Sequence, residues 1–313
     1  MVIFARRGGI FCPLHKFDLN FTKSTMKNAN KVSRSFQHMI LLCGCLLIYY
    51  SVSARQHKPT ESGYIAQKTQ GIDSDYVLIF NSYSESAPWC RSLVDSTVMD
   101  LIKLSPQTMT VTQNLNSGLL RDEKALAQLR QQVDVSYHDK PRMIIYIGST
   151  SWPFLHETIE KKWGKVPSII FSDIDYTGPI TNLLRKTPIA PALRIPYDKI
   201  VKEYEGALSV VYMPIYLRQS LALMHQLTPP MTELCFISDT RWISAQMRAD
   251  MAAITKTDFP ELKVRYLISA DMSTLDLLDS LQHYGQETGV LFFSWLKQSQ
   301  VGDSFVNDSH FRI

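Results

Sequence analysis

The stretch YVLIFNSYSESAPW, residues 76–89, decides how the rest of this chain is interpreted. Val77 to Phe80 are four consecutive apolar residues, a pattern typical of a strand buried on both faces of a parallel sheet. Asn81 to Ser84 then place an amide and several hydroxyl groups where that strand ends. In open α/β sheets, ligands bind at the carboxyl ends of the strands. The stretch therefore predicts one edge of a binding site.

Strand and helix patterns alternate after this stretch, and they predict an α/β fold with parallel sheets flanked by helices. A helix from about Pro88 to Leu104 comes next. The later strands are expected at residues 109–111, 143–147, 169–171, 208–213, 234–237, 264–268 and 290–293. Helices between them are indicated by apolar residues at helical spacing, namely Leu119, Leu126, Leu129 and Val133, then Trp152, Leu155, Ile159 and Trp163, then residues 215–227, and then Ile243, Met247, Met251 and Ile254.

The alternation is interrupted between Tyr176 and Gly206, where four prolines fall within eighteen residues. Such a break is typical of a domain boundary. We therefore expect an N-terminal extension and signal peptide at residues 1–54, a linker at 55–74, a first lobe at 75–180, a crossover or insert at 181–206 and a second lobe at 207–313. Because the chain turns polar after Trp295, we expect no further packed element and an incomplete second lobe.

The first 54 residues have the composition of an export region. They carry seven Lys or Arg residues and one acidic residue, whereas the rest of the chain carries 26 basic and 28 acidic residues. With a start at Met26, a basic segment precedes the apolar run 39–50 and the small residues 52–54, as in a cleaved signal peptide. An uncleaved N-terminal anchor is the alternative. The excess positive charge belongs to targeting, so we expect a periplasmic protein without a nucleic-acid partner.

Cysteine and histidine usage indicates neither a disulfide framework nor a cofactor. Beyond the export region the chain has two distant cysteines, Cys90 and Cys235, which we expect to be buried apolar residues. The histidines are scattered and lack the spacing of metal ligands. No Ser-His-Asp set, nucleophile elbow or phosphate loop is present in the sequence. We expect no cofactor and no catalysis.

Polar residues follow the predicted buried strands. They occupy positions 81–83, 148–150, 172–173, 238–239 and 294, and the aromatic residues Trp89, Trp152, Tyr216 and Trp242 are near them in sequence. Short polar groups would orient a polar organic ligand, and the aromatic rings would stack on it. The alternative is that these residues cap the helices that follow.

A catalytic alternative comes from Asp173 to Thr177, which spell DxDxT, the nucleophile motif of haloacid-dehalogenase-type phosphatases. Paired carboxylates there would bind magnesium, and the first would attack phosphorus. Two observations count against this function. Three predicted strands precede the motif, whereas in those phosphatases the nucleophile follows the first strand of the core. The segment at Gly302 would correspond to the metal-binding end of that family, but residues 297–300 before it are polar and do not have the pattern of an apolar strand.

Five segments carry a resemblance that extends over residues 75–300. They are VLIFNSYSESAPW (77–89), HETIEKKWGKVPSIIFSDIDYTGP (156–179), VVYMPIYLRQSLALMHQL (210–227), LCFISDTRWISAQMRADM (234–251) and TGVLFFSW (288–295). In these segments the chain resembles the periplasmic sensor domain of hybrid two-component histidine kinases of the Bacteroides group. That domain is related to the type 1 periplasmic binding proteins of ABC transporters.

The resemblance implies a two-lobed clamshell with a small ligand between the lobes, and closure signalled through the membrane to a kinase. The positions that it assigns to the ligand site are Ser82, Tyr83, Ser149, Asp173, Tyr216, Asp239 and Arg241. A free solute-binding protein of an ABC transporter is the alternative function. A homodimer, as in sensor kinases, is a further partner that the resemblance allows.

The chain departs from these kinases beyond the second lobe. It contains no phosphoacceptor histidine box, no ATP-binding glycine boxes and no receiver module. We therefore expect it to act without phosphorylating anything, either as a fragment or as a truncated gene product, with membrane anchoring only in a full-length protein. Sheets without their returning strands would expose unpaired edges.

Overall fold

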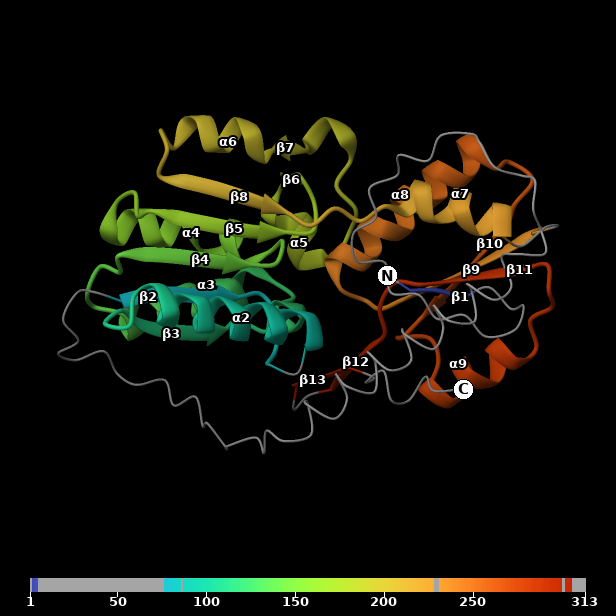
Figure 1. Ribbon diagram of the computed structural model, residues 1–313, viewed down its shortest axis with the longest axis horizontal. Helices are drawn as coiled ribbons and strands as arrows, with labels where there is room; N and C mark the ends of the chain where they lie inside the picture. Colours follow the sequence, from blue (N-terminus) through green and yellow to red (C-terminus); the bar gives the residue numbers. More distant parts are fainter. Residues whose placement is uncertain (1, 5–75, 86, 228–230, 300–301, 306–313) are drawn as a thin grey trace, which may run out of the picture. The chain divides into compact units, whose positions relative to one another are not determined.

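The apolar run at the start of the predicted first lobe forms β2 (Tyr76–Asn81), which lies inside a five-stranded sheet (Figure 1). The structure, a computed structural model, describes residues 2–4, 76–85, 87–227, 231–299 and 302–305. These residues all belong to one compact unit of the chain. The predicted signal segment from Met26 to Ala54 and the predicted linker at 55–74 lie outside the described residues.

The strands of this first sheet pair in parallel in the order β3–β2–β4–β5–β8. Besides β2 they are β3 (Met109–Asn114), β4 (Met143–Ile147), β5 (Ser168–Ser172) and β8 (Leu208–Tyr212). The chain between them forms α2 (Pro88–Leu104), the 3₁₀ turn η2 (Ser117–Leu119), α3 (Glu123–Ser136) and α4 (Ser151–Trp163). Strand β3 lies at one edge of this sheet.

Both faces of β2 are covered, which explains why its apolar run is unbroken. Leu78 and Phe80 pack in one cluster with residues of α3 and α4, whereas Val77 and Ile79 pack in another cluster with residues of α2. Successive side chains of a strand point to opposite faces of the sheet. Each face therefore needs its own helical cover, and Figure 1 shows helices on both.

Strand β8 corrects the sequence interpretation, which assigned residues 208–213 to the second lobe. It pairs in parallel with β5, from Ser168 with Leu208 to Ser172 with Tyr212, and so belongs to the first sheet. The prolines that suggested a boundary instead begin short elements, since Pro179 and Pro196 are N-caps and Pro191 opens a 3₁₀ turn. These elements are β6 (Tyr176–Thr177), α5 (Ile180–Arg185), η3 (Pro191–Leu193), β7 (Ile195–Pro196) and α6 (Tyr197–Glu203).

A second sheet has the parallel strands β11–β9–β10 with β9 in the middle. Its strands and helices are α7 (Leu217–Leu227), β9 (Glu233–Ser238), α8 (Trp242–Asp258), β10 (Lys263–Ile268), α9 (Thr274–Gln282) and β11 (Thr288–Phe292). Phe236 packs with residues of α7 and α8, and Ile237 packs with Leu277 of α9. The expected class, α/β with parallel sheets flanked by helices, is thus confirmed. Cys90 and Cys235 are free and buried, also as predicted.

Two short pairings differ from the sequence interpretation. β1 (Val2–Phe4), within the predicted N-terminal extension, pairs antiparallel with β11. β12 (Leu296–Ser299) and β13 (Gly302–Phe305) pair antiparallel with each other, although no packed element was expected after Trp295. Trp295 is buried, and its indole N–H donates to Thr274 Oγ1 at 3.1 Å, so this side chain anchors the chain just before β12.

Local capping explains where the helices begin and end. A capping box begins α9, with reciprocal hydrogen bonds between Ser273 and Asp276. Gly164 ends α4 at a φ of 71°. Asp122 caps α3 by accepting a hydrogen bond from the backbone N–H of Ala125. Leu119, which was counted in that helix, precedes this cap and lies in η2.

Candidate functional site

Ser82 follows β2 and is fully buried, but its hydroxyl is engaged within the protein. Ser82 Oγ accepts a hydrogen bond from the backbone N–H of Ser151, the first residue of α4, at 2.9 Å. The backbone N–H of Ser82 donates to the carbonyl of Ile147 at 2.8 Å. Ser82 therefore joins the ends of β2 and β4 to the start of α4.

Tyr83 is a buried phenol at the same edge of the sheet. Its backbone N–H donates to Asn81 Oδ1 at 3.2 Å. Burial and the negative charge of Asp173 raise its pKa well above the ordinary value, while Arg241 and the Ser149 hydroxyl lower it in part. Ser149 Oγ is itself buried and makes no hydrogen bond of normal geometry in the described part of the chain. Tyr83, Ser149 and Asp173 therefore lie close together.

Gly148 makes room for this arrangement. It has a φ of 87°, and a Cβ atom added to it would lie 2.8 Å from both Ser82 Oγ and Tyr83 Cε2. Left-handed backbone favours glycine, and the close approach excludes a side chain. Gly206 has the same φ of 87° but nothing within 4 Å of its added Cβ.

We expect Gly148→Ala to lower the free energy of unfolding by about 1 kcal/mol more than Gly206→Ala does, because only Gly148 adds a steric clash to the backbone cost. Urea denaturation of the two variants measures the difference. Equal losses would show that the site tolerates the extra methyl group.

Asp239 and Arg241 lie where β9 leads into α8, and they form a buried ion pair. Arg241 Nη2 is 2.8 Å and Nε is 2.9 Å from Asp239 Oδ2. The backbone N–H of Arg241 and the hydroxyl of Ser244 both donate to Asp239 Oδ1. Burial would raise the pKa of Asp239, but the charge and the hydrogen bonds of Arg241 and Ser244 hold it below the ordinary value. Asp239 is therefore ionised and fully engaged.

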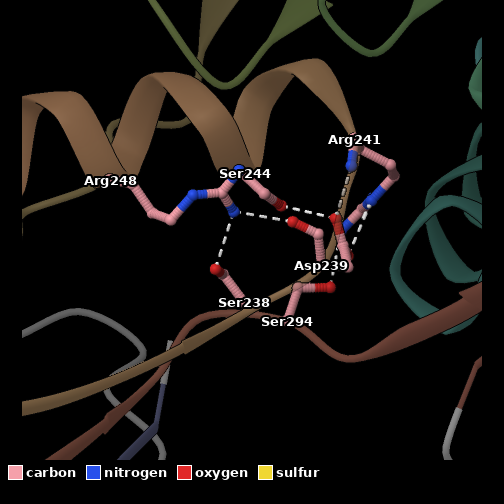
Figure 2. A network of polar contacts seen from close by, with 6 residues as sticks. All are labelled: Ser238, Asp239, Arg241, Ser244, Arg248 and Ser294. Atoms are coloured by element: carbon pink, nitrogen blue, oxygen red, sulfur yellow. Dashed lines mark hydrogen bonds and ion pairs between the residues drawn. The ribbon is translucent and has the colours of Figure 1, made fainter. Parts of the chain in front are cut away.

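Sequence reasoning missed two members of this network, which Figure 2 shows. Ser244 binds the Asp239 carboxylate from the first turn of α8, and Arg248 donates from Nη1 to Ser238 Oγ at 2.8 Å and to the Asp239 carbonyl at 2.7 Å. Arg241 also reaches Ser294, beyond β11, at 2.5 Å. Positions 241, 244 and 248 share one helical face, a spacing from which this network could have been predicted.

The polar residues that follow β2, β4 and β5 meet the network that follows β9 at Arg241. Its guanidinium carbon lies 5.0 Å from the centre of the Tyr83 ring, a cation–π contact that joins the ends of β2 and β9. Burial raises the pKa of Asp173 from 3.8 to about 6, although the charge of Arg241 counteracts this. Asp173 has no ion pair or side-chain hydrogen bond among the described residues. Ser82, Tyr83, Ser149, Asp173, Asp239 and Arg241 are therefore brought to one region.

Tyr216 is not part of that region. It is 55% exposed and lies just before α7. Its neighbours Ile215 and Leu217 line a cavity of about 660 Å³, but Tyr216 itself is not among the lining residues. Its ligand-binding role stays a prediction without support from this geometry.

The cavity lies beside Asp173, where β5 and β8 end. Its polar wall contains four aspartates, two arginines, two tyrosines and a glutamine, namely Asp173, Asp175, Asp198, Asp250, Arg194, Arg218, Tyr176, Tyr212 and Gln219. Its apolar wall is formed by Ile174, Pro196, Pro214, Ile215, Leu217, Met247 and Ile254. A concave wall that combines apolar side chains with convergent polar groups, at this volume, is typical of small-molecule sites.

The described residues contain no group of three or more His, Cys, Asp or Glu side chains placed to hold a metal ion. None of the helices in this part of the chain combines the length and apolar character needed to cross a membrane. The apolar run 39–50, where an anchor was considered, lies outside the described residues.

No known family model, curated protein or solved structure matches the chain. Its function is therefore inferred from the sequence and from the geometry of the cavity and its polar neighbours.

Proposed function

We propose that the chain binds a small polar ligand in the cavity beside Asp173 and carries out no chemistry on it. In this proposal the chain is the extracytoplasmic ligand-sensing part of a two-component signalling protein. Ligand binding would change how the two sheets contact each other, and a membrane-bound partner module would detect the change.

The observation that carries the proposal is the state of Asp173. Its carboxyl group is partly buried, lines a cavity of about 660 Å³ and has no ion pair or side-chain hydrogen bond among the described residues. Burying a carboxylate without a partner costs free energy. A ligand that donates hydrogen bonds to Asp173 would recover that cost, so binding would be favourable at this position.

A two-lobed type 1 periplasmic-binding-protein fold is part of the proposal. The support for it is that two separate parallel sheets place polar strand ends in one region, with Arg241 from the second sheet over Tyr83 from the first. Ligands of open α/β sheets bind at such strand ends. The resemblance to sensor domains adds support for sensing over transport.

The transport alternative uses the same cavity and differs only in its partner. Binding measurements therefore do not separate a sensor from a solute-binding protein. A neighbouring coding region for kinase modules would favour the sensor, whereas neighbouring permease genes would favour transport.

We expect a thermal-shift screen of the whole chain against sugars, amino acids, amines and organic acids to find a stabilising ligand, because binding to the folded state raises stability. Asp173→Asn should weaken the binding of that ligand by about tenfold or more, since hydrogen bonds to charged groups contribute about 1.5 to 3 kcal/mol. Asp100→Asn is the matched control, because Asp100 is an exposed aspartate on α2. Calorimetric titration gives the affinities.

Two outcomes would contradict the proposal. The first is a ligand whose affinity is the same in wild type and Asp173→Asn. The second is hydrolysis of p-nitrophenyl phosphate with magnesium that Asp173→Asn abolishes, because that result would favour the DxDxT phosphatase mechanism.

A further inference from the structure

The two arginines of the cavity are both neutralised within the protein. Arg194 Nη2 lies 3.0 Å from Asp250 Oδ1, and Arg218 is ion-paired with Asp258. Arg194 also lies over the ring of Tyr176, with its guanidinium carbon 4.4 Å from the ring centre. An anionic ligand would have to compete with carboxylates for both arginines.

Three of the cavity carboxylates are not neutralised in this way. Asp173 and Asp175 have no ion pair or side-chain hydrogen bond among the described residues. Asp198 accepts a hydrogen bond from the Tyr212 hydroxyl at 3.2 Å, which leaves its charge in place. The side-chain charge available to a ligand is therefore negative.

Tyr176 provides a second, independent indication that a ligand group belongs here. The residue is only 7% exposed, and its hydroxyl has no hydrogen-bond partner among the described residues. Burial raises the pKa of this phenol, with a further contribution from Asp250 and Asp175 and an opposing one from Arg194. Tyr176 and these three neighbours all line the cavity, so the hydroxyl lies among the groups of the cavity wall. A buried hydroxyl without a partner costs free energy that a ligand could recover.

We propose, on the basis of the function proposed above, that the cavity takes a small organic cation whose ammonium or guanidinium group pairs with Asp173 and Asp175. The Tyr176 hydroxyl accepts a further hydrogen bond from that group. The hydrocarbon part of the ligand contacts the apolar wall, which includes Ile174, Ile215 and Met247.

The cavity suits an organic cation better than a metal ion or an anion. Its volume of about 660 Å³ is far larger than one ion needs, and much of its wall is apolar. An organic anion would meet three uncompensated carboxylates, because both arginines are already paired. Like charges at short distance repel each other, which excludes anions from this site.

Four probes of similar length test the charge of the ligand, and all are titrated calorimetrically against the whole chain. Putrescine and agmatine are cations, 1,4-butanediol is the neutral analogue of putrescine, and succinate is an anion of the same carbon number. We expect at least one of the two cations to bind saturably and neither 1,4-butanediol nor succinate to bind. Added salt should weaken the binding of the cation.

Asp173→Asn and Asp175→Asn are each expected to weaken binding of the cation by about tenfold or more, while Asp100→Asn leaves it unchanged. Asp175 is exposed, so its replacement tests the site even if Asp173→Asn alters folding. Failure of both cations to bind, or equal affinities in all of these variants, would overturn the inference.

The same experiment separates the charge of the ligand from the proposed function. Ile215→Trp would fill part of the cavity. If succinate or 1,4-butanediol binds to wild type and this variant loses the binding, the cavity is a ligand site and only the charge inference is wrong. If no probe binds and the wider thermal-shift screen also finds no ligand, the proposed function fails as well.

Discussion

Asp239→Ala is expected to lower the free energy of unfolding by about 3 to 5 kcal/mol, because it leaves the buried Arg241 guanidinium without its counter-charge. The Asp239 side chain is 0% exposed and that of Arg241 is 12% exposed, so water cannot replace the lost partner. The same change removes the acceptor of the Ser244 hydroxyl and of the Arg241 backbone N–H. Urea denaturation followed by circular dichroism measures the loss.

Two further variants test the cause of this effect. Asp239→Ala combined with Arg241→Met should be less destabilised than the sum of the single variants, because no buried charge is left unpaired. Asp95→Ala removes an exposed partner of Arg91, whose Nε lies 3.7 Å away, and should cost less than about 1 kcal/mol. A loss for Asp239→Ala as small as that for Asp95→Ala would contradict the structural role of the buried pair.

The second prediction concerns Asp173 and pH. As the pH rises from about 4 to about 6, wild type should lose between about 2 and 3 kcal/mol of stability relative to Asp173→Asn. The reason is that folding raises the pKa of the Asp173 carboxyl group from 3.8 to about 6. Over that interval the folded protein still holds a proton that the unfolded chain has released. The unfolded state therefore binds fewer protons, and stability falls as pH rises. Asparagine has no proton to release, so the variant lacks this loss.

Several neighbours influence the titration of Asp173. Burial raises its pKa and Arg241 lowers it, and its own charge raises the pKa of Tyr83, Cys90 and Tyr197. Thermal or urea unfolding of wild type and Asp173→Asn at a series of pH values measures the difference. Asp100→Asn provides the reference for an exposed aspartate. A difference between wild type and Asp173→Asn that does not change with pH would contradict the raised pKa.

The predicted helices and strands were largely correct because their signals are local. Val77 to Phe80 form a strand covered on both faces, and the capping box at Ser273 begins α9. Both depend on residues that are neighbours in the sequence. Leu119 was the exception, because apolar spacing alone could not show that Asp122 starts the helix after it.

The partners of the strands were less predictable. The prolines before β8 resemble a domain boundary in the sequence, yet β8 pairs with β5 in the first sheet. Pairing depends on residues that are distant in the chain, and the same proline residues can either separate domains or begin short elements within one.

The sequence likewise predicted some features of the candidate site and not others. The rule that polar residues at strand ends lie together placed Tyr83, Ser149 and Asp173 in one region, and it also placed Asp239 and Arg241 in one region. It did not place Tyr216, which is exposed. It also could not show that the Ser82 hydroxyl is engaged within the protein, since its partner, the backbone N–H of Ser151, belongs to α4 and is distant in the sequence.

The amino-acid sequence by itself determined the α/β class, the order of most elements and the set of polar strand ends, because apolar periodicity and capping act over a few residues. Only the tertiary structure decided which sheet contains β8, which carboxylates are paired and which face a cavity. Asp173 and Asp239 both follow a buried strand in the sequence. They differ because Arg241 forms an ion pair with Asp239, whereas Asp173 lines a cavity and has no ion pair among the described residues.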